Sequence, residues 1–320
     1  MRAPLTDVCF GSLEVAIFKV LCEGGVGNRL ICLANGIWLS RYFGLTFEVL
    51  WPVNRYCGAV LADVLVDDYG AANIGKLQLG KQRIDFLITN CENFLGLENI
   101  YTFNPCRLKG YEALCRFSSL LRNDSKVVIF LNRILPFAYD DVSSIIQGFR
   151  FNRLAIDVCN DFMRTNGLSD KTIAFHLRGT DGFNPLRVGV AVWRIRMRSF
   201  FRRQAVLVTD DVRLSDIADR FPFIVRRKNI CLPSRSDESQ SWGALCIDEN
   251  HQLLPYNVRR DECVVFDAIV DLILLSRCRP ALTSFSTFLE VAVIKSEQRF
   301  SVCRIAFKFS SYIRPLLGRR

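Results

Sequence analysis

Blocks of hydrophobic positions separated by polar turns predict strands and helices in alternation along most of the chain. The apolar run 13–21 predicts a buried strand, and the glycine-rich turn 22–28 follows it. The segment 29–43 has the largely apolar character of a covered helix that ends at Gly44, and 46–51 predicts the next strand. Strand, glycine loop, helix and strand form a βαβ unit, which predicts a parallel sheet covered by helices.

In the rest of the first half, the segment 58–120 mixes helix and loop signals, and 126–131 predicts one short strand. The second half repeats the alternation of strands and helices more clearly. Beyond residue 150 the pattern predicts helices at 151–165, 190–203, 212–220, 262–276 and 286–294, and strands at 172–176, 205–208, 223–225 and 280–283. A chain of 320 residues exceeds the usual size of one compact domain. We therefore predict an α/β protein of two domains, residues 1–150 and 151–320.

Three polar clusters follow predicted strands at their carboxyl ends, at 176–181, 209–211 and 284–287. In open α/β sheets, ligands bind beyond this end of the strands. Within the first cluster, Arg178 offers a planar fork of donors suited to a pyrophosphate, and His176 lies two residues earlier on the same strand face. An arginine paired with a carboxylate and a neutral core histidine would have the same sequence. The coincidence of three clusters favours a ligand site.

The net charge of +10 indicates ligands or partners that carry negative charge, such as phosphate groups, nucleic acid or an acidic membrane surface. The basic residues are spread, with the densest runs at 194–198, 202–203 and 226–228. Such runs are typical of solvated helix faces rather than of a nucleic-acid site. The tail 304–320 mixes apolar residues with five basic ones, which predicts either a packed terminal helix or a peripheral contact with an anionic membrane.

The 13 cysteines are scattered and no Cys-x-x-Cys pair occurs, so neither a zinc site nor a regular disulfide framework is indicated. Cys32, Cys159, Cys263 and Cys278 lie in apolar runs and are interpreted as small core residues. The apolar stretch 8–21 lacks the features of a signal peptide, and no segment reaches membrane-spanning length. We therefore expect a soluble cytoplasmic protein, with the inner face of a membrane as the place where its tail would bind.

Several segments resemble the motifs of one family, the fucosyltransferase superfamily. Phe175–Asp181 resembles the donor-binding peptide of that superfamily, which includes α-1,6- and α-1,2-fucosyltransferases, rhizobial nodulation fucosyltransferases and protein O-fucosyltransferases. Gly24–Leu30 resembles their N-terminal glycine loop, and Val208–Asp211 resembles their second strand-end motif. Asp271–Cys278 followed by Thr283–Phe288 is similar to their C-terminal motif. The order and spacing of these segments agree over most of the chain.

The resemblance implies a GT-B fold, in which two Rossmann-like domains face a central cleft and the C-terminal one holds most of the nucleotide. It also implies an inverting glycosyltransferase that transfers fucose from GDP-fucose to a glycan or polysaccharide acceptor. Arg178 would bind the β-phosphate, Asp210 would face the guanosine end, and Ser286 and Thr287 would donate to the phosphates from a helix N-terminus. The residues that the resemblance implies for GDP-sugar binding are Gly25, Gly27, Asn28, His176, Arg178, Asp210, Asp271, Ser286 and Thr287.

The chemistry of sugar transfer gives Arg178 and Asp181 a catalytic interpretation. A guanidinium at Arg178 would stabilise the charge that develops on the departing GDP. No Asp-x-Asp motif occurs, so we expect no metal and no cofactor apart from the donor substrate. Inverting transfer also needs a general base. No glutamate occurs between Ala174 and Asp237, so Asp181, the acid nearest to the phosphate peptide, is the candidate base or else a residue that caps its loop.

The loop after the second predicted strand would open onto the cleft from the acceptor side. Trp51 is a candidate for stacking on a sugar face, and Asn54 and Arg55 are candidates for binding acceptor or donor. The alternative is a loop fixed by Pro52 with a packed tryptophan. These residues predict neither the acceptor nor the linkage.

Two other classes of protein fit parts of the pattern. A Rossmann oxidoreductase or methyltransferase would explain the glycine loop, but the loop lacks the Gly-x-Gly-x-x-Gly order and no acidic residue ends the second strand. A nucleotide-sugar-binding protein, or a degenerate relative without turnover, would explain the missing glutamate near the phosphate peptide.

Overall fold

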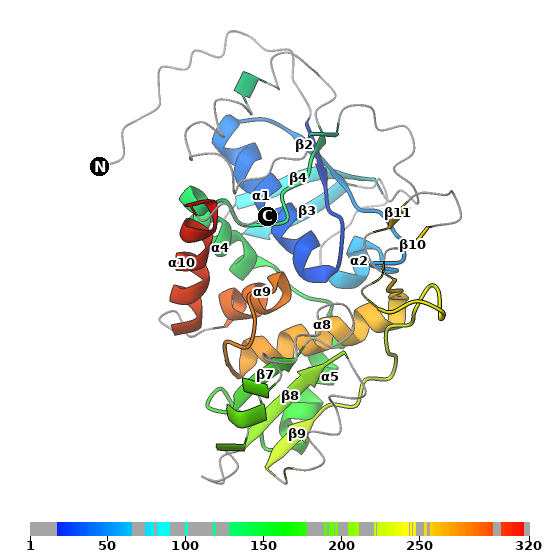
Figure 1. Cartoon of the computed structure of the whole chain (residues 1–320). Coiled ribbons are helices and arrows are strands. Elements are labelled where there is room, and N and C mark those ends of the chain that lie inside the picture. Colours follow the sequence, from blue (N-terminus) through cyan, green and yellow to red (C-terminus); the bar gives the residue numbers. More distant parts are fainter. Residues whose placement is uncertain are drawn as a thin grey trace.

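In the part of the chain that the structure describes, the strands form a six-stranded sheet, a four-stranded sheet and a separate two-stranded pair, and helices lie between and around the two larger sheets (Figure 1). The computed structural model describes residues 18–65, 74–79, 82–89, 100–101, 118–119, 128–177, 189–190, 192–194, 196–197, 204–210, 221, 223–242, 244, 246–247, 253–254, 257–296 and 302–316. The predicted helix 212–220 lies outside the described residues, as does most of the predicted helix 190–203.

The first sheet has six strands in the order β3-β4-β2-β1-β6-β5. Its strands are β1 (Phe18–Leu21), β2 (Phe47–Leu50), β3 (Ile74–Leu79), β4 (Gln82–Thr89), β5 (Ile100–Tyr101) and β6 (Val128–Ile129). β1 pairs in parallel with β2 and β6, as the βαβ pattern predicts, whereas β3 runs antiparallel to β4. The prediction of a parallel sheet is therefore wrong at this edge. Only two residues separate β3 from β4, and so short a connection joins antiparallel strands.

The second sheet has four parallel strands in the order β12-β7-β8-β9. Its strands are β7 (Ile173–Leu177), β8 (Ala205–Thr209), β9 (Ile224–Arg226) and β12 (Arg279–Pro280). A separate antiparallel pair is formed by β10 (Cys246–Ile247) and β11 (Leu253–Leu254). β7 and β8 are buried along their whole length, as expected for strands made mainly of apolar residues. Leu177 pairs with Thr209, so the carboxyl ends of the two strands lie side by side.

The helices connect and cover the sheets (Figure 1). They are α1 (Val26–Phe43), α2 (Leu61–Val64), the 3-10 helix η2 (Pro136–Ala138), α4 (Tyr139–Gly148), α5 (Arg153–Thr165), α8 (Glu262–Arg277), α9 (Thr287–Lys295) and α10 (Val302–Leu316). α1 is buried over most of its length because β1, β2, α4 and α9 pack against it, and most of its residues are accordingly apolar. It begins three residues before the predicted helix 29–43, and it ends as predicted at Gly44, whose φ of 68° is left-handed.

The C-terminal helices return to the first sheet's half of the molecule. α9 packs against α1 and α4, and the Lys295 ammonium donates to the carbonyls of Gln147 at 2.9 Å and Phe149 at 2.6 Å. One continuous hydrophobic core consequently runs from α1 through α9 and α8 to the second sheet. The division into domains 1–150 and 151–320 stays a prediction.

α10 is a packed helix, which is one of the two structures expected for the tail. Cys303 and Phe307 are buried on one face, whereas Ile305 and Phe309 on the opposite face are 61% and 64% exposed. No helix in the described part of the chain is both long and apolar enough to cross a membrane.

Candidate functional site

A pocket lies where the carboxyl ends of β7 and β8 meet the N-terminal ends of α1 and α9, with α8 along one side. Apart from Ser286, every donor-site residue predicted from the sequence that the structure describes lines this pocket. The lining residues are Gly25, Val26, Gly27, Asn28, His176, Val208, Thr209, Asp210, Asn229, Pro233, Arg260, Val264, Val265, Ala268, Asp271, Thr287 and Phe288. Segments from both halves of the sequence thus form one site.

The N-termini of α1 and α9 touch each other in the pocket wall. A Cβ added to Gly27 would lie 2.6 Å from the Phe288 nitrogen, so only glycine permits this approach. The Thr287 hydroxyl donates to Asn28 Oδ1 at 2.6 Å, which joins the two first turns. The contact directs the free backbone N–H groups of both helices toward one space, an arrangement that favours anions.

Ser286 has a different place from the one implied by the resemblance. It is the N-cap of α9, and its Oγ accepts a hydrogen bond from the Leu289 backbone nitrogen at 3.2 Å. This bond satisfies one of the unpaired donors of the first turn and explains where α9 begins. Ser286 therefore stabilises the helix end and does not line the pocket itself.

The two strand ends contribute His176 and Asp210. His176 is buried, its ring lies 5.0 Å from the ring of Phe288, and its carbonyl accepts a 2.5 Å hydrogen bond from the Thr283 hydroxyl. Asp210 follows β8 directly and is half-buried. The parallel pairing of β7 and β8 brings these two residues to the same edge of the sheet.

A buried charge network supports Asp271. Arg227 donates to Asp267 at 2.7 Å and to Asp271 at 2.9 Å, and all three side chains are buried. Asn229 donates a weaker hydrogen bond of 3.4 Å to Asp271. Burial raises the pKa of the Asp271 carboxyl to about 6, although the neighbouring Arg227 guanidinium opposes this shift. Asp271 therefore changes charge close to neutral pH.

The sequence interpretation of this network was incomplete. The prediction that the run 226–228 is a solvated face is wrong for Arg227. Its guanidinium lies between the buried carboxylates of Asp267 and Asp271. Asp267 and Asn229 were not predicted either. The signal was present on α8: Asp267 and Asp271 are four residues apart on an apolar helix and share one face, and buried carboxylates require a partner.

Arg260 is a pocket residue that the sequence analysis missed. Its backbone nitrogen donates to the Arg55 carbonyl at 2.7 Å, and its carbonyl accepts from the Gly58 nitrogen at 2.8 Å. A Cβ on Gly58 would lie 2.9 Å from that carbonyl, so the loop after β2 fits closely against the segment that precedes α8. Arg55 and Asn54, the acceptor-side candidates, belong to this loop and lie outside the pocket lining.

The prediction that Trp51 stacks on a sugar is wrong. Its side chain is fully buried and its indole N–H donates to the Ala59 carbonyl at 3.0 Å. Arg29 lies over the ring at 5.0 Å and also donates to the Gly24 and Pro52 carbonyls, each at 2.7 Å. Trp51 is thus the packed tryptophan of the alternative interpretation.

Arg178 and Asp181, the catalytic candidates, lie outside the described residues. His176, two residues before Arg178 in the sequence, is described and lines the pocket. In the described part of the chain, no three His, Cys, Asp or Glu side chains gather as a metal site would require.

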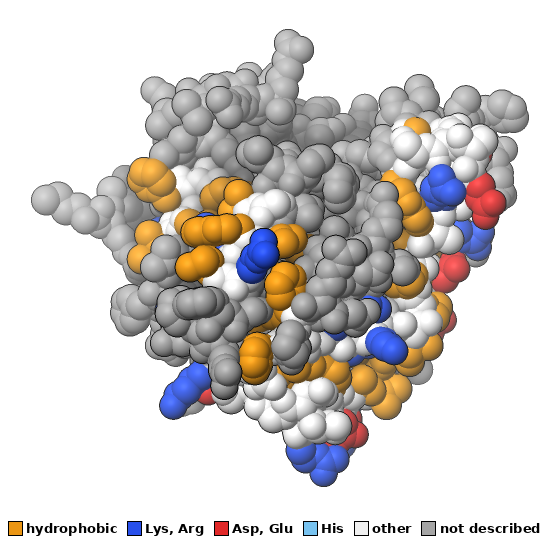
Figure 2. All heavy atoms as spheres, turned by 60° about the horizontal axis from the view of Figure 1, so that its bottom comes forward, with side chains coloured by type: hydrophobic (Ala, Val, Ile, Leu, Met, Phe, Trp, Pro, Cys, Tyr) orange, Lys and Arg blue, Asp and Glu red, His pale blue; other side chains and the backbone are white. Residues whose placement is uncertain are grey.

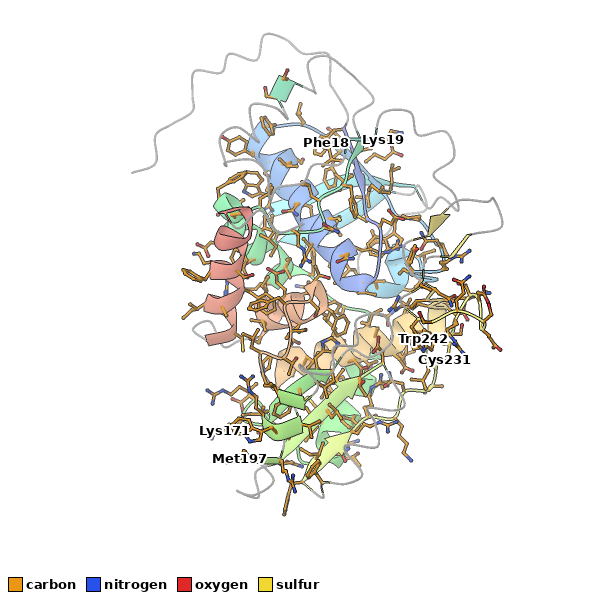
Figure 3. All side chains as sticks on the ribbon, in the orientation of Figure 1. Phe18, Lys19, Lys171, Met197, Cys231 and Trp242 are labelled. Atoms are coloured by element: carbon orange, nitrogen blue, oxygen red, sulfur yellow. A yellow bond between two sulfur atoms is a disulfide. The ribbon has the colours of Figure 1, made fainter. Side chains whose placement is uncertain are left out.

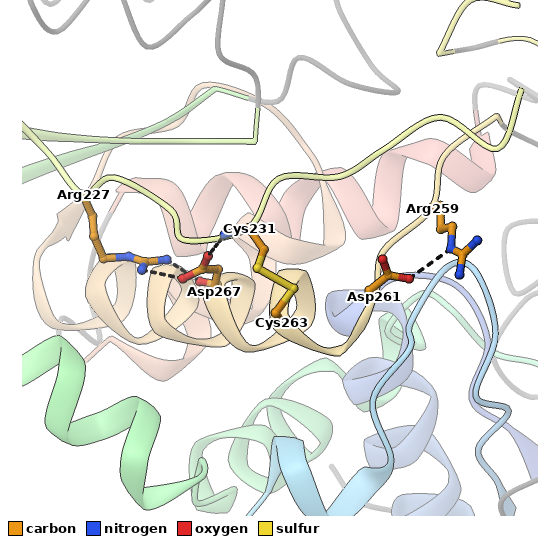
Figure 4. The surroundings of a disulfide bond; sticks show 6 residues. All are labelled: Arg227, Cys231, Arg259, Asp261, Cys263 and Asp267. Carbon is orange, nitrogen blue, oxygen red and sulfur yellow. Dashed lines mark hydrogen bonds and ion pairs between the residues drawn. A yellow bond between two sulfur atoms is a disulfide. The ribbon is translucent and has the colours of Figure 1, made fainter. Parts of the chain in front are cut away.

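A disulfide joins Cys231 to Cys263 beside the pocket, with 5.8 Å between the Cα atoms (Figure 4). Figure 3 labels Cys231 on the side of the molecule where α8 begins, and Cys263 belongs to the first turn of that helix. The interpretation of Cys263 as a core cysteine is therefore wrong. Cys32, Cys159 and Cys278 are buried and free, as predicted.

The architecture is that of a GT-B protein, as predicted. No protein-family model matches the chain, and no curated protein matches it. NodZ α-1,6-fucosyltransferase co-crystallized with GDP has a TM-score of 0.52 at 12% identity, over 89% of this chain and 93% of that chain. NodZ from Bradyrhizobium in selenomethionine form has a TM-score of 0.52 at 11% identity over the same shares of each chain. A mutant of Arabidopsis thaliana FUT1 in complex with GDP has a TM-score of 0.51 at 10% identity, over 89% of this chain and 70% of that chain. The chain therefore has the fold of these fucosyltransferases.

Proposed function

We propose that this protein is an inverting, metal-independent glycosyltransferase that transfers fucose from GDP-fucose to a glycan or polysaccharide acceptor. The observation that carries the proposal is the meeting of the α1 and α9 N-termini with the carboxyl ends of β7 and β8 in one pocket. Two helix N-termini suit a diphosphate, because their backbone N–H groups and their dipoles both favour negative charge. The fold shared with NodZ, which was crystallized with GDP, supports the same ligand.

The diphosphate lies, in this proposal, between the glycine loop and the first turn of α9. Gly25 has no side chain to cover the N-terminus of α1, and an added Cβ there would meet no atom within 4 Å. Asn28 and Thr287 contribute polar side chains, and Arg260 contributes a positive charge to the pocket lining. Arg178 keeps the role implied by the resemblance, which is to bind the β-phosphate and stabilise the leaving group.

The nucleobase lies at the other end, near Asp210 and Asp271. Ionised carboxylates are acceptors only, so they complement the N–H donors on the Watson–Crick edge of guanine. Asn229 adds an amide beside them. His176 and Phe288, whose rings are 5.0 Å apart, form the adjoining wall.

Sugar transfer then requires an acceptor and a base. The loop with Asn54 and Arg55 is held against Arg260, so it is placed to contact an acceptor that approaches the pocket from the first sheet's side. Asp181 stays the proposed base. The charge of the leaving diphosphate is neutralised by Arg178 and the helix N-termini rather than by a metal.

A turnover assay with GDP-fucose tests this function. We expect the protein to release GDP from GDP-fucose, slowly in water and faster with a glycan acceptor, and to do so equally well in EDTA. Arg178→Ala should lower the rate on the order of 100- to 1000-fold while the protein stays folded. Loss of activity in EDTA would contradict metal independence. Binding of GDP-fucose without hydrolysis or transfer would instead favour the nucleotide-sugar-binding protein without turnover.

Peripheral contact with an anionic membrane is part of the proposal, because the acceptor of such an enzyme can be membrane-bound. Ile305 and Phe309 are exposed on α10, whose sequence contains three basic residues and no acidic one. Figure 2 shows hydrophobic and basic side chains together on the left of the molecule, the side on which α10 lies in Figure 1.

The cytoplasmic location expected from the cysteine pattern is opposed by the bond between Cys231 and Cys263, since disulfides persist mainly in oxidising compartments.

A further inference from the structure

The Cys231–Cys263 disulfide lies within the wall of the donor pocket. Cys231 stands between Asn229 and Pro233, which both line the pocket, and Cys263 precedes the lining residue Val264 on the first turn of α8. The bond therefore ties an irregular segment of the wall directly to the helix that forms the side of the site (Figure 4).

The segment 227–234 has two further attachments. At one end Arg227 binds the carboxylates of α8, and at the other Ser234 and Arg259 exchange backbone hydrogen bonds of 3.0 and 2.7 Å. Between these points Ile230 is 84% exposed and Leu232 is 40% exposed, whereas Pro233 is buried, so apolar packing holds one end of the segment and not its centre. The disulfide, the 2.8 Å bond from the Cys231 nitrogen to Asp267 and the weaker 3.4 Å bond from Asn229 to Asp271 hold its centre.

We propose that Cys231 and Cys263 are a positioning pair for nucleotide binding, whose disulfide holds the Asn229–Pro233 wall in place and whose reduction weakens the binding of GDP. This inference rests on the proposed function, because it takes the pocket to be the GDP site. The reaction is a two-electron reduction by a dithiol. The S–S bond breaks, each Sγ takes up a proton to become a thiol, and the dithiol is oxidised to its own disulfide.

The expected effect follows from the order that the bond imposes on the wall. Without the bond, the segment 228–233 has more conformations, and nucleotide binding must restrict them again. We expect reduction to weaken GDP binding roughly tenfold, within the range usual for coupling between two sites.

The experiment compares GDP titrations of the full chain, oxidised and after dithiothreitol, with the state of the Cys231–Cys263 pair determined by alkylation and peptide mass spectrometry. The oxidised protein should bind GDP roughly tenfold more tightly. The double variant Cys231→Ser/Cys263→Ser should bind like the reduced protein and should not respond to dithiothreitol. Cys159→Ser, which changes a free buried cysteine, should retain the response.

Three results would overturn the inference. They are equal GDP affinity of the oxidised and reduced protein, a double variant that still responds to dithiothreitol, and a pair that mass spectrometry finds unbonded in protein purified without reductant. Thermal unfolding of each variant establishes that the protein is folded at the temperature of the titration. Absence of GDP binding in both redox states would contradict the proposed function instead, so the two failures are distinguishable.

Discussion

Thr287 donates a 2.6 Å hydrogen bond to Asn28, and this bond joins residues that are 259 positions apart in the sequence. It lies at the point where α9 and α1 both begin, so it fixes the direction of two helix N-termini at once. The anion binding that we propose for the pocket depends on that arrangement, because the helix dipole acts mainly within the first turn.

Removal of this bond should weaken nucleotide binding without unfolding the protein. Thr287→Val keeps the size of the side chain and loses the hydroxyl. We expect the free energy of GDP binding to become less favourable by about 0.5–1.5 kcal/mol, the usual net contribution of one hydrogen bond. We therefore expect a roughly two- to twelvefold rise in the Kd for GDP, measured by calorimetry. Thr165→Val, at an exposed position on the end of α5, is the matched control and should leave the Kd unchanged. Equal affinities for all three proteins would mean that the bond does not shape the site.

The close approach of the two helices predicts a difference between neighbouring glycines. Gly27→Ala should destabilise the protein by about 1–3 kcal/mol, because the new methyl group would meet the backbone of Phe288 at 2.6 Å. Gly25→Ala is the control, since a Cβ at that position meets nothing within 4 Å and the Gly25 φ of −72° suits alanine. Urea unfolding measures the free energy of unfolding of both variants. A similar decrease in the two variants would contradict the close packing of α1 against α9.

Nucleotide binding should depend on the charge of Asp271. Its pKa of about 6 lies above the ordinary value of 3.8, so the carboxyl takes up a proton as the pH falls through about 6. The protonated form loses acceptor capacity, and GDP affinity should then fall by up to about tenfold for each further pH unit. The phosphate of GDP also titrates near pH 6, so the comparison is with Asp271→Asn, in which the phosphate still titrates and the side chain at position 271 does not. Parallel pH profiles for the two proteins would show that Asp271 does not bind the nucleotide as a carboxylate.

Arg29 should be a major contributor to stability although it does not line the pocket. Its buried guanidinium binds the carbonyls of Gly24 and Pro52 and the side chain of Asn54. Arg29→Met would remove the guanidinium donor from the Gly24 and Pro52 carbonyls, at a cost of about 1–3 kcal/mol for each buried carbonyl, whereas Asn54 Oδ1 would still accept from the Tyr56 nitrogen at 3.0 Å. Thermal unfolding should show a marked decrease in Tm, whereas the exposed Arg153→Met should show almost none. An unchanged Tm for Arg29→Met would be evidence against the role of Arg29 in holding the glycine loop.

The sequence predicted those parts of the fold that rest on local pattern. Mainly apolar runs mark β1, β7 and β8, and Gly44 marks the end of α1, because burial and left-handed backbone conformations restrict the residue types at these positions. The polar residues at the strand ends could also be predicted, because ligands bind beyond the carboxyl ends of strands in open α/β sheets. The structure brings His176, Asp210 and Thr287 into one pocket.

Features that depend on contacts between distant segments were not predicted. Arg227 follows a strand and is flanked by basic residues, and only its contact with α8, which is distant in the sequence, places it between Asp267 and Asp271. The partner of Cys263 could not be chosen among twelve other cysteines without the position of Cys231. The burial of Trp51 likewise depends on Arg29, which comes from the preceding helix.

Calorimetric titration of the oxidised protein with GDP, compared with ADP under the same conditions, tests the central claim most directly. A pocket with two helix N-termini for the diphosphate and two carboxylates for guanine should bind GDP in a one-to-one ratio and ADP at least about tenfold more weakly, since adenine would leave buried polar groups unpaired. Arg178→Ala, folded as judged by its thermal unfolding, should bind GDP more weakly than the parent protein. Failure of GDP to bind, or equal binding of GDP by the parent and Arg178→Ala, would contradict the account.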